Sequence, residues 1–206
     1  FFNLEETPPS TADPLKTMGL VLYLNDLIRN NPEKIKNVAI IHIIRDPRDF
    51  VTSFMNWKNR KLSGIIAHHL TPYWMPKPKV TGIKSLWKTI SMSKFEHFCW
   101  IWNFKNKLIY DSFSDLPNYH LLKFEDVIED PDTIKTIQGI ISGDRTKADP
   151  KIQSSVLEKR NESIKKSFPN WKEWDPKKAK ILEEHCGVMM KMFSYGAEVE
   201  WRDKLN

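Results

Sequence analysis

The feature that most constrains this chain is a short run of β-branched, apolar residues that ends abruptly in charge. Residues 38–44 read Val-Ala-Ile-Ile-His-Ile-Ile, and the charged segment 45–49 (Arg-Asp-Pro-Arg-Asp) follows directly. A strand that is apolar on both faces is typical of a parallel sheet covered on both sides. We therefore expect a central strand at 38–44. We also expect a charged turn at its carboxyl end and a helix from about Asp49, whose side chain would cap it.

Patterns of helix and strand alternate along the rest of the chain. Apolar residues at helical spacing predict further helices, an alternating stretch predicts a second strand, and two Asp-Pro pairs mark helix starts. The expected elements are helices at 15–30, 49–60, 93–114, 130–141 and from 175 to 195, and a second strand at 119–124. Alternating strands and helices indicate an α/β class with a mostly parallel sheet. A length of 206 residues suits a single domain spanning 1–206.

The composition of the chain leaves several classes of protein open, whereas the strand pattern favours one fold class. The chain carries a net charge of +6, which suits nucleic acid, a membrane surface or a small polyanion. The basic residues are spread along the sequence, which argues against a nucleic-acid arm. No apolar run approaches the ~20 residues that a membrane-spanning helix needs. The two cysteines, Cys99 and Cys186, are expected to be buried, reduced thiols of a cytoplasmic protein.

Two side chains near the strand end are suited to holding a phosphate. Arg45 follows the strand directly, and Ser53 lies eight residues further on, in the first turns of the expected helix. In open α/β sheets, ligands bind beyond the carboxyl ends of strands, where helix N-termini point. A guanidinium and a hydroxyl there would hold one phosphate from two sides. The alternative is that Arg45 pairs with Asp46 or Asp49 and only ties down the turn.

The segment 43–49 (Ile-Ile-Arg-Asp-Pro-Arg-Asp) followed by Ser53 resembles the 3′-phosphate-binding motif of sulfotransferases. These enzymes use 3′-phosphoadenosine 5′-phosphosulfate (PAPS). A second segment, 122–131, resembles the strand and acidic stretch of the same family. The resemblance implies a three-layer α/β/α, P-loop NTPase-like fold with a mostly parallel central sheet. It also implies that Arg45 and Ser53 bind the 3′-phosphate of PAPS, with adenosine 3′,5′-bisphosphate (PAP) as the product and no metal. Glu125 or Asp126, in the second segment, is expected to brace a turn.

The same resemblance suggests further site residues. The C-terminal part looks like the family's closing loop, whose basic residues cover the donor phosphates; here these would be Arg160, Lys165 and Lys166. Residues 4–8 (Leu-Glu-Glu-Thr-Pro) resemble the Glu-Lys-Thr-Pro segment of heparan-type members of the family, with Glu6 in the place of their Lys. The resemblance makes Glu5 or Glu6 a possible catalytic base. The family's phosphate loop does not occur in the sequence. We expect this sequence to begin within a longer protein, after the first strand and that loop.

The sequence thus predicts an enzyme that transfers a sulfuryl group to a hydroxyl or amine. An aromatic-rich stretch around Tyr73, Trp74 and Trp87 is the expected acceptor side, suited to a small molecule, a sugar or a lipid-like alcohol. His42, within the strand, is expected to be buried against a helix. Two other functions remain open. One is a P-loop nucleotide kinase, and the other is a basic binding module for RNA or sulfated polysaccharide.

Overall fold

The computed structural model describes residues 30, 33, 39–58, 92–142 and 168–206. Within these ranges the chain is mixed α/β and mostly helical, with a small parallel sheet of two strands, β1 (Ile40–Ile44) and β2 (Tyr119–Lys123). The strands pair in register from Ile40 opposite Tyr119 to Ile44 opposite Lys123. Both expected strands and their parallel pairing are confirmed. The expected helix at 15–30 lies outside the described residues, apart from residue 30.

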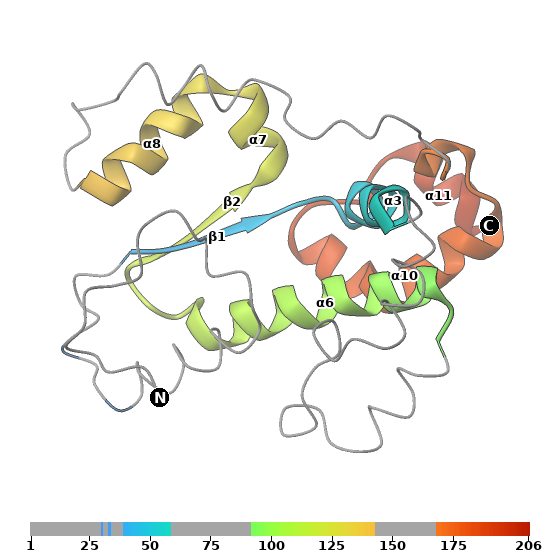
Figure 1. The fold of residues 1–206 in the computed structure, drawn as a ribbon, viewed down its shortest axis with the longest axis horizontal. Coiled ribbons are helices and arrows are strands. Elements are labelled where there is room, and N and C mark those ends of the chain that lie inside the picture. Colours follow the sequence, from blue (N-terminus) through green and yellow to red (C-terminus); the bar gives the residue numbers. More distant parts are fainter. Residues whose placement is uncertain (1–29, 31–32, 34–38, 59–91, 143–167) are drawn as a thin grey trace.

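The described helices lie around this sheet (Figure 1). Four of them match the expected helices closely, and each match has a capping or periodicity signal in the sequence. The short helices α7, α11 and the 3₁₀ turn η1 were not expected. The bounds are α3 (Pro47–Lys58), α6 (Lys94–Phe113), α7 (Phe124–Glu129), α8 (Pro131–Ser142), η1 (Trp171–Glu173), α10 (Pro176–Met192) and α11 (Val199–Leu205).

Helix starts follow local side-chain chemistry. Ser93 caps α6 by accepting a hydrogen bond from the backbone N–H of Glu96, and Asp175 caps α10 in the same way ahead of Pro176. The start of α3 differs from the expectation that Asp49 caps it. The helix begins at Pro47, and the carboxylate of Asp46 accepts from the N–H of Arg48 at 2.8 Å. The Asp-Pro signal, strong elsewhere in this chain, applies here too.

One core joins β1, α3, α6, α10 and α11. It is built from apolar side chains of α6 and α10, which pack against each other, with tryptophans from the C-terminal part of the chain. Cys99 and Cys186 are both buried and unbridged, as expected, and the Cys186 thiol donates to the Cys99 carbonyl at 3.3 Å. The fully buried large residues include Trp102, Trp174, Trp201, Phe98 and Phe113. This core fixes the carboxyl end of β1 against three helices.

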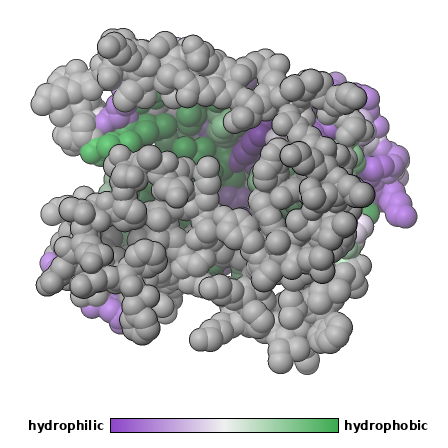
Figure 2. All heavy atoms as spheres, viewed as in Figure 1, coloured by the Kyte–Doolittle hydropathy of each residue, from purple (hydrophilic) through white to green (hydrophobic). Residues whose placement is uncertain are grey.

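The region around α7 and α8 is less enclosed. Ile134 of α8 is buried, whereas Ile141 is 72% exposed, and Ile43 of β1 is 46% exposed. In Figure 2 the largest apolar area of described atoms lies where Figure 1 places α8 and the strands. No described helix is long and apolar enough to cross a membrane.

Candidate anion-binding site

The turn between β1 and α3 is joined to the rest of the described structure by several hydrogen bonds. It lies at the carboxyl end of a parallel strand and at the N-terminus of a helix, where anions are favoured. Phe50 N–H donates to the Asp46 carbonyl at 2.9 Å, and Asp46 N–H donates to Oε1 of Glu125 at 3.0 Å. Glu125 comes from α7, which follows β2. The strand ends are therefore linked by a side chain as well as by the sheet.

Arg48 occupies the inner side of this turn. Its residue is 1% exposed, and its guanidinium bonds Asp46 and reaches both carboxylate oxygens of Glu198 at 2.8 and 2.9 Å. The guanidinium carbon lies 4.3 Å from the ring centre of Trp171 and 5.2 Å from that of Trp201. Burial alone would lower the pKa of Arg48, but its hydrogen bonds and charge contacts with the two carboxylates raise it. Arg48 is therefore a permanently charged, fully bonded structural group.

Tyr195 closes the network from the C-terminal side. Its hydroxyl donates to Oε2 of Glu125 at 2.7 Å and lies 3.4 Å from the carbonyl of Ile44. Burial raises the pKa of Tyr195, and the hydrogen bond to Glu125 raises it further, so the hydroxyl stays a donor. Glu125 thus bonds one partner with each carboxylate oxygen. The expectation that Glu125 or Asp126 braces a turn is met by Glu125, which braces the turn after β1.

Arg45 occupies the outer side of the turn. Its side chain is half-buried, with the guanidinium carbon 4.9 Å from the ring centre of Phe124. The Nε atom is buried and has no hydrogen-bond partner in the described part of the chain. Arg45 forms no ion pair there with Asp46 or Asp49; the ion pair inside the turn belongs to Arg48. Its backbone is held, because Trp102 donates to the Arg45 carbonyl at 2.9 Å.

Ser53 is exposed on the second turn of α3. It lies four residues after Asp49, so the two share one face of the helix. Burial raises the pKa of the Asp49 carboxyl, the charge of Asp46 adds to this, and the charge of Arg45 acts in the opposite direction. Asp49 is therefore close enough to interact with Arg45, and Ser53 lies one helical turn beyond it on the same face.

The remaining expected site residues are Glu5, Glu6, Arg160, Lys165 and Lys166, together with the aromatic stretch around Tyr73, Trp74 and Trp87; all of them lie outside the described residues. His42 is described, and it is buried against α6 as expected. Its ring bonds the Tyr119 hydroxyl at 2.7 Å and the Asn106 side-chain oxygen at 2.9 Å. Burial lowers the pKa of His42, although the bond to Asn106 opposes this. A neutral histidine with both nitrogens bonded is a structural group.

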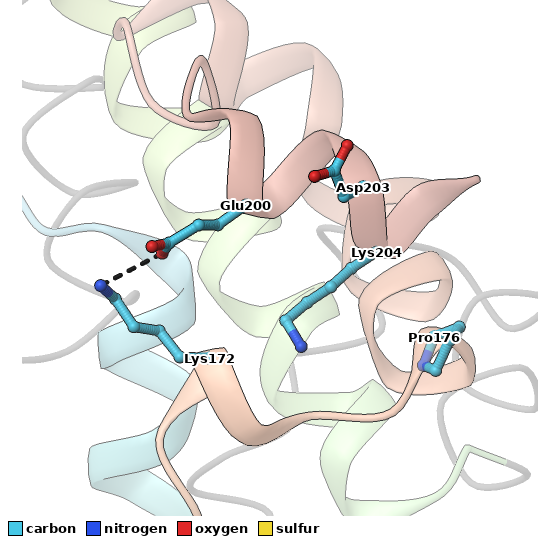
Figure 3. A pocket seen from close by; sticks show the side chains of 5 residues that line it. All are labelled: Lys172, Pro176, Glu200, Asp203 and Lys204. Carbon is cyan, nitrogen blue, oxygen red and sulfur yellow. Dashed lines mark ion pairs between the residues drawn. The ribbon is translucent and has the colours of Figure 1, made fainter.

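A pocket lies near the C-terminal end of the chain, between η1, α10 and α11 (Figure 3). Lys172 pairs with Glu200 across it at 3.1 Å, and Lys204 donates to the Trp174 carbonyl at 2.9 Å. Its charges are of both signs and both lysines have partners, so we assign it no ligand. It is lined by Lys172, Pro176, Glu200, Asp203 and Lys204.

Comparison with known proteins adds nothing to this geometry. No protein-family model, curated protein or solved structure matches the chain. The sulfotransferase resemblance therefore rests on the motif residues of the sequence alone.

Three residues that shape this turn were not predicted to do so. Arg48 lies in the motif, but its sequence position does not distinguish it from Arg45. Tyr195 and Glu198 lie about 150 residues along the chain from Ile44 and Arg48, which they contact. An Asp-Pro helix start was the one usable signal. It would have placed the Asp46 carboxylate at the helix N-terminus, within reach of Arg48.

Proposed function

We propose that this chain is part of a PAPS-dependent sulfotransferase and that Arg45 and Ser53 bind the 3′-phosphate of the donor. The observation that carries the proposal is the buried Arg45 Nε without a partner. A buried N–H donor without an acceptor is costly, and an oxyanion of the ligand would satisfy it. The turn around Arg45 is fixed on the inner side, which suits a preorganised phosphate site.

The proposal includes the fold. A two-stranded parallel sheet is rarely stable alone, because parallel strands are normally buried within a larger sheet. The strands β1 and β2 would be neighbours in a three-layer α/β/α, P-loop-like domain. Exposed apolar residues such as Ile43 fit a sheet that continues or is covered further.

In the proposed reaction an acceptor hydroxyl or amine attacks the sulfur in line with the leaving oxygen. A base, for which Glu5 and Glu6 are the predicted residues, takes the acceptor proton as the new bond to sulfur forms. The sulfur–oxygen bond to the donor breaks, and its electron pair leaves on the 5′-phosphate of PAP. Arg45 and Ser53 would anchor the nucleotide at its 3′-phosphate, away from the reacting sulfur, and the chemistry requires no metal.

The decisive experiment compares two nucleotides that differ only in the 3′-phosphate. Calorimetry would measure the binding of PAP and of adenosine 5′-monophosphate to the wild type and to Arg45→Ala. A charge-assisted contact is worth about 1.5–3 kcal/mol, so Arg45→Ala should weaken PAP about 10- to 100-fold and leave the monophosphate almost unchanged. Ser53→Ala should weaken PAP by a smaller factor.

Lys107→Ala is the matched control, because Lys107 is an exposed cation that pairs with Asp111 of the same helix at 2.6 Å and with no residue of the turn. It should bind PAP like the wild type. Equal affinity of the wild type for the two nucleotides, or unchanged PAP affinity in Arg45→Ala, would refute the assignment. Turnover with ATP and Mg²⁺ in place of PAPS would instead favour a nucleotide kinase.

A further inference from the structure

The loop that follows α10 reaches back to the carboxyl ends of both strands. We call residues 194–198 the C-terminal brace. Tyr195 contacts Ile44 at the end of β1 and Glu125 just after β2. Lys123, the last residue of β2, lies with Nζ 4.6 Å from the ring centre of Tyr195 and 3.4 Å from the Ser194 carbonyl. One loop thus binds the two strand ends from the same side.

The brace is aimed at the strands by the way α10 ends. Tyr195 N–H donates to the Met190 carbonyl at 2.8 Å and Ser194 N–H to the Lys191 carbonyl at 3.1 Å. These two bonds form a Schellman motif, which requires a left-handed residue, here Ser194 with φ 59°. The chain then turns again at Gly196, with φ 76°. A Cβ on Gly196 would lie 3.0 Å from Met190 Cε, so the bend is tightly packed.

Glu198 adds the second attachment. It receives two hydrogen bonds from Arg48, and Arg48 in turn bonds the Asp46 carboxylate that caps α3. The residues on both sides of Arg45 are therefore held by the brace. Ile44 is contacted through its carbonyl by Tyr195, and Asp46 is held through Glu125 and Arg48.

We infer that Tyr195 and Glu198 are positioning residues: they hold the turn after β1 so that Arg45 presents its guanidinium to an oxyanion. Neither residue would touch the ligand. The inference deepens the proposed function and rests on it for the identity of the ligand. It is tested with Tyr195→Phe and Glu198→Gln, with PAP and adenosine 5′-monophosphate as the probes.

Each variant isolates one attachment. Tyr195→Phe removes one hydroxyl without changing charge. Glu198→Gln removes a negative charge near the turn, which by electrostatics alone would strengthen anion binding; a weaker affinity would therefore report lost positioning. Glu200→Gln is the matched control, because Glu200 lies two residues on and pairs with Lys172 at 3.1 Å, away from the turn (Figure 3).

Two measurements are needed on each protein. Calorimetry should show PAP binding weakened about fivefold or more in both variants, with monophosphate binding unchanged and Glu200→Gln like the wild type. Hydrogen exchange without ligand should show the amides of Asp46, Arg48 and Phe50 opening about tenfold faster in both variants. The amides of α6 should exchange at the wild-type rate, because the core is intact.

The outcomes separate the two proposals. Faster exchange with unchanged PAP affinity would make the brace purely structural and overturn the inference, as would unchanged exchange. Weaker PAP binding without faster exchange would also overturn it, because the side chain would then contact the ligand directly. If the wild type binds no PAP, the proposed function fails, and the exchange of the three turn amides alone decides whether the brace holds the turn.

Discussion

The two sides of the turn after β1 carry arginines three residues apart with opposite environments. On the inner side, Arg48 is 1% exposed, contacts two indole rings, and bonds two carboxylates. On the outer side, Arg45 is half-buried, contacts one aromatic ring, and keeps a buried Nε without a partner in the described chain. Similar side chains in one turn thus differ in how much bonding capacity remains for a ligand.

The two environments show which of the two arginines has a structural role. A buried guanidinium is tolerated when fixed carboxylates surround it, and removing one member of such a network leaves uncompensated charge. Arg48 meets this condition and Arg45 does not. The inner arginine therefore supports the turn, and the outer arginine keeps hydrogen-bonding capacity for the proposed ligand. Four measurements test this division, beginning with the strongest.

Replacing Arg48 by Ala should have the largest effect on stability. Asp46 and Glu198 would lose their shared partner, and Asp46 would be left buried and unpaired. Breaking a buried pair costs about 3–5 kcal/mol, whereas Arg45→Ala should cost less than about 1 kcal/mol. Urea unfolding followed by tryptophan fluorescence would measure both. Arg48→Lys, which keeps the charge, should fall between them.

Equal losses for Arg45→Ala and Arg48→Ala would contradict the division into a structural and a binding arginine. If Arg48→Ala does not fold, Arg48→Lys still decides the matter, because a loss no larger than that of Arg45→Ala would remove the distinction.

The second measurement extends the comparison along α3. Asn56, on the buried side of the helix, accepts from Phe168 N–H at 2.7 Å and donates to the Phe168 carbonyl at 3.1 Å. Asn56→Ala would leave both backbone groups without these bonds and should cost about 2 kcal/mol. Ser53→Ala, on the exposed face of the same helix, should change stability by less than about 0.5 kcal/mol. A large loss in Ser53→Ala would show that the outer side also supports the fold.

The sequence predicts those strands and helix starts that are determined by residues close together in the chain. The run at 38–44 has the β-branched pattern of a buried strand, and its core, Ile40–Ile44, is a strand. Asp-Pro pairs at 130–131 and 175–176 gave helix starts, because capping and proline geometry act within one turn. The prediction that Asp49 caps α3 is wrong because the same Asp-Pro signal at Asp46 and Pro47 starts the helix three residues earlier.

Long-range features could not be predicted in the same way. Glu198 and Arg48 form an ion pair because the segment between α10 and α11 packs against the turn. No spacing in the sequence predicts that these two distant residues come together. The helix α7 is six residues long, too short for a hydrophobic period to show, and its first residues were assigned to the preceding strand and an acidic stretch. Arg45 and Ser53 could be named from the motif, but the difference between Arg45 and Arg48 is a property of packing.

The third measurement concerns the brace that serves the inner side. Ser194 adopts φ 59°, a conformation that costs a residue with a Cβ about 1 kcal/mol and glycine almost nothing. Because glycine also loses more entropy on folding, Ser194→Gly should stabilise the protein by no more than about 1 kcal/mol. Thermal unfolding of the variant would measure this gain. A loss larger than about 1 kcal/mol, which the entropy of glycine can cost, would mean that the serine side chain itself supports the brace.

The smallest effect expected is on the acid dependence of stability, through Glu198. Its hydrogen bonds from Arg48 lower the pKa of its carboxyl below the usual value of 4.5, although partial burial opposes this. A carboxyl whose pKa is lower in the folded state contributes stability above its unfolded pKa and loses it as the pH falls through the folded pKa. Because the Glu198 side chain is 48% exposed, solvent screens most of this contribution. Urea midpoints of the wild type should therefore fall slightly more steeply below about pH 4.5 than those of Glu198→Gln. Parallel curves for the two proteins would show that the inner network does not depend on the charge of Glu198.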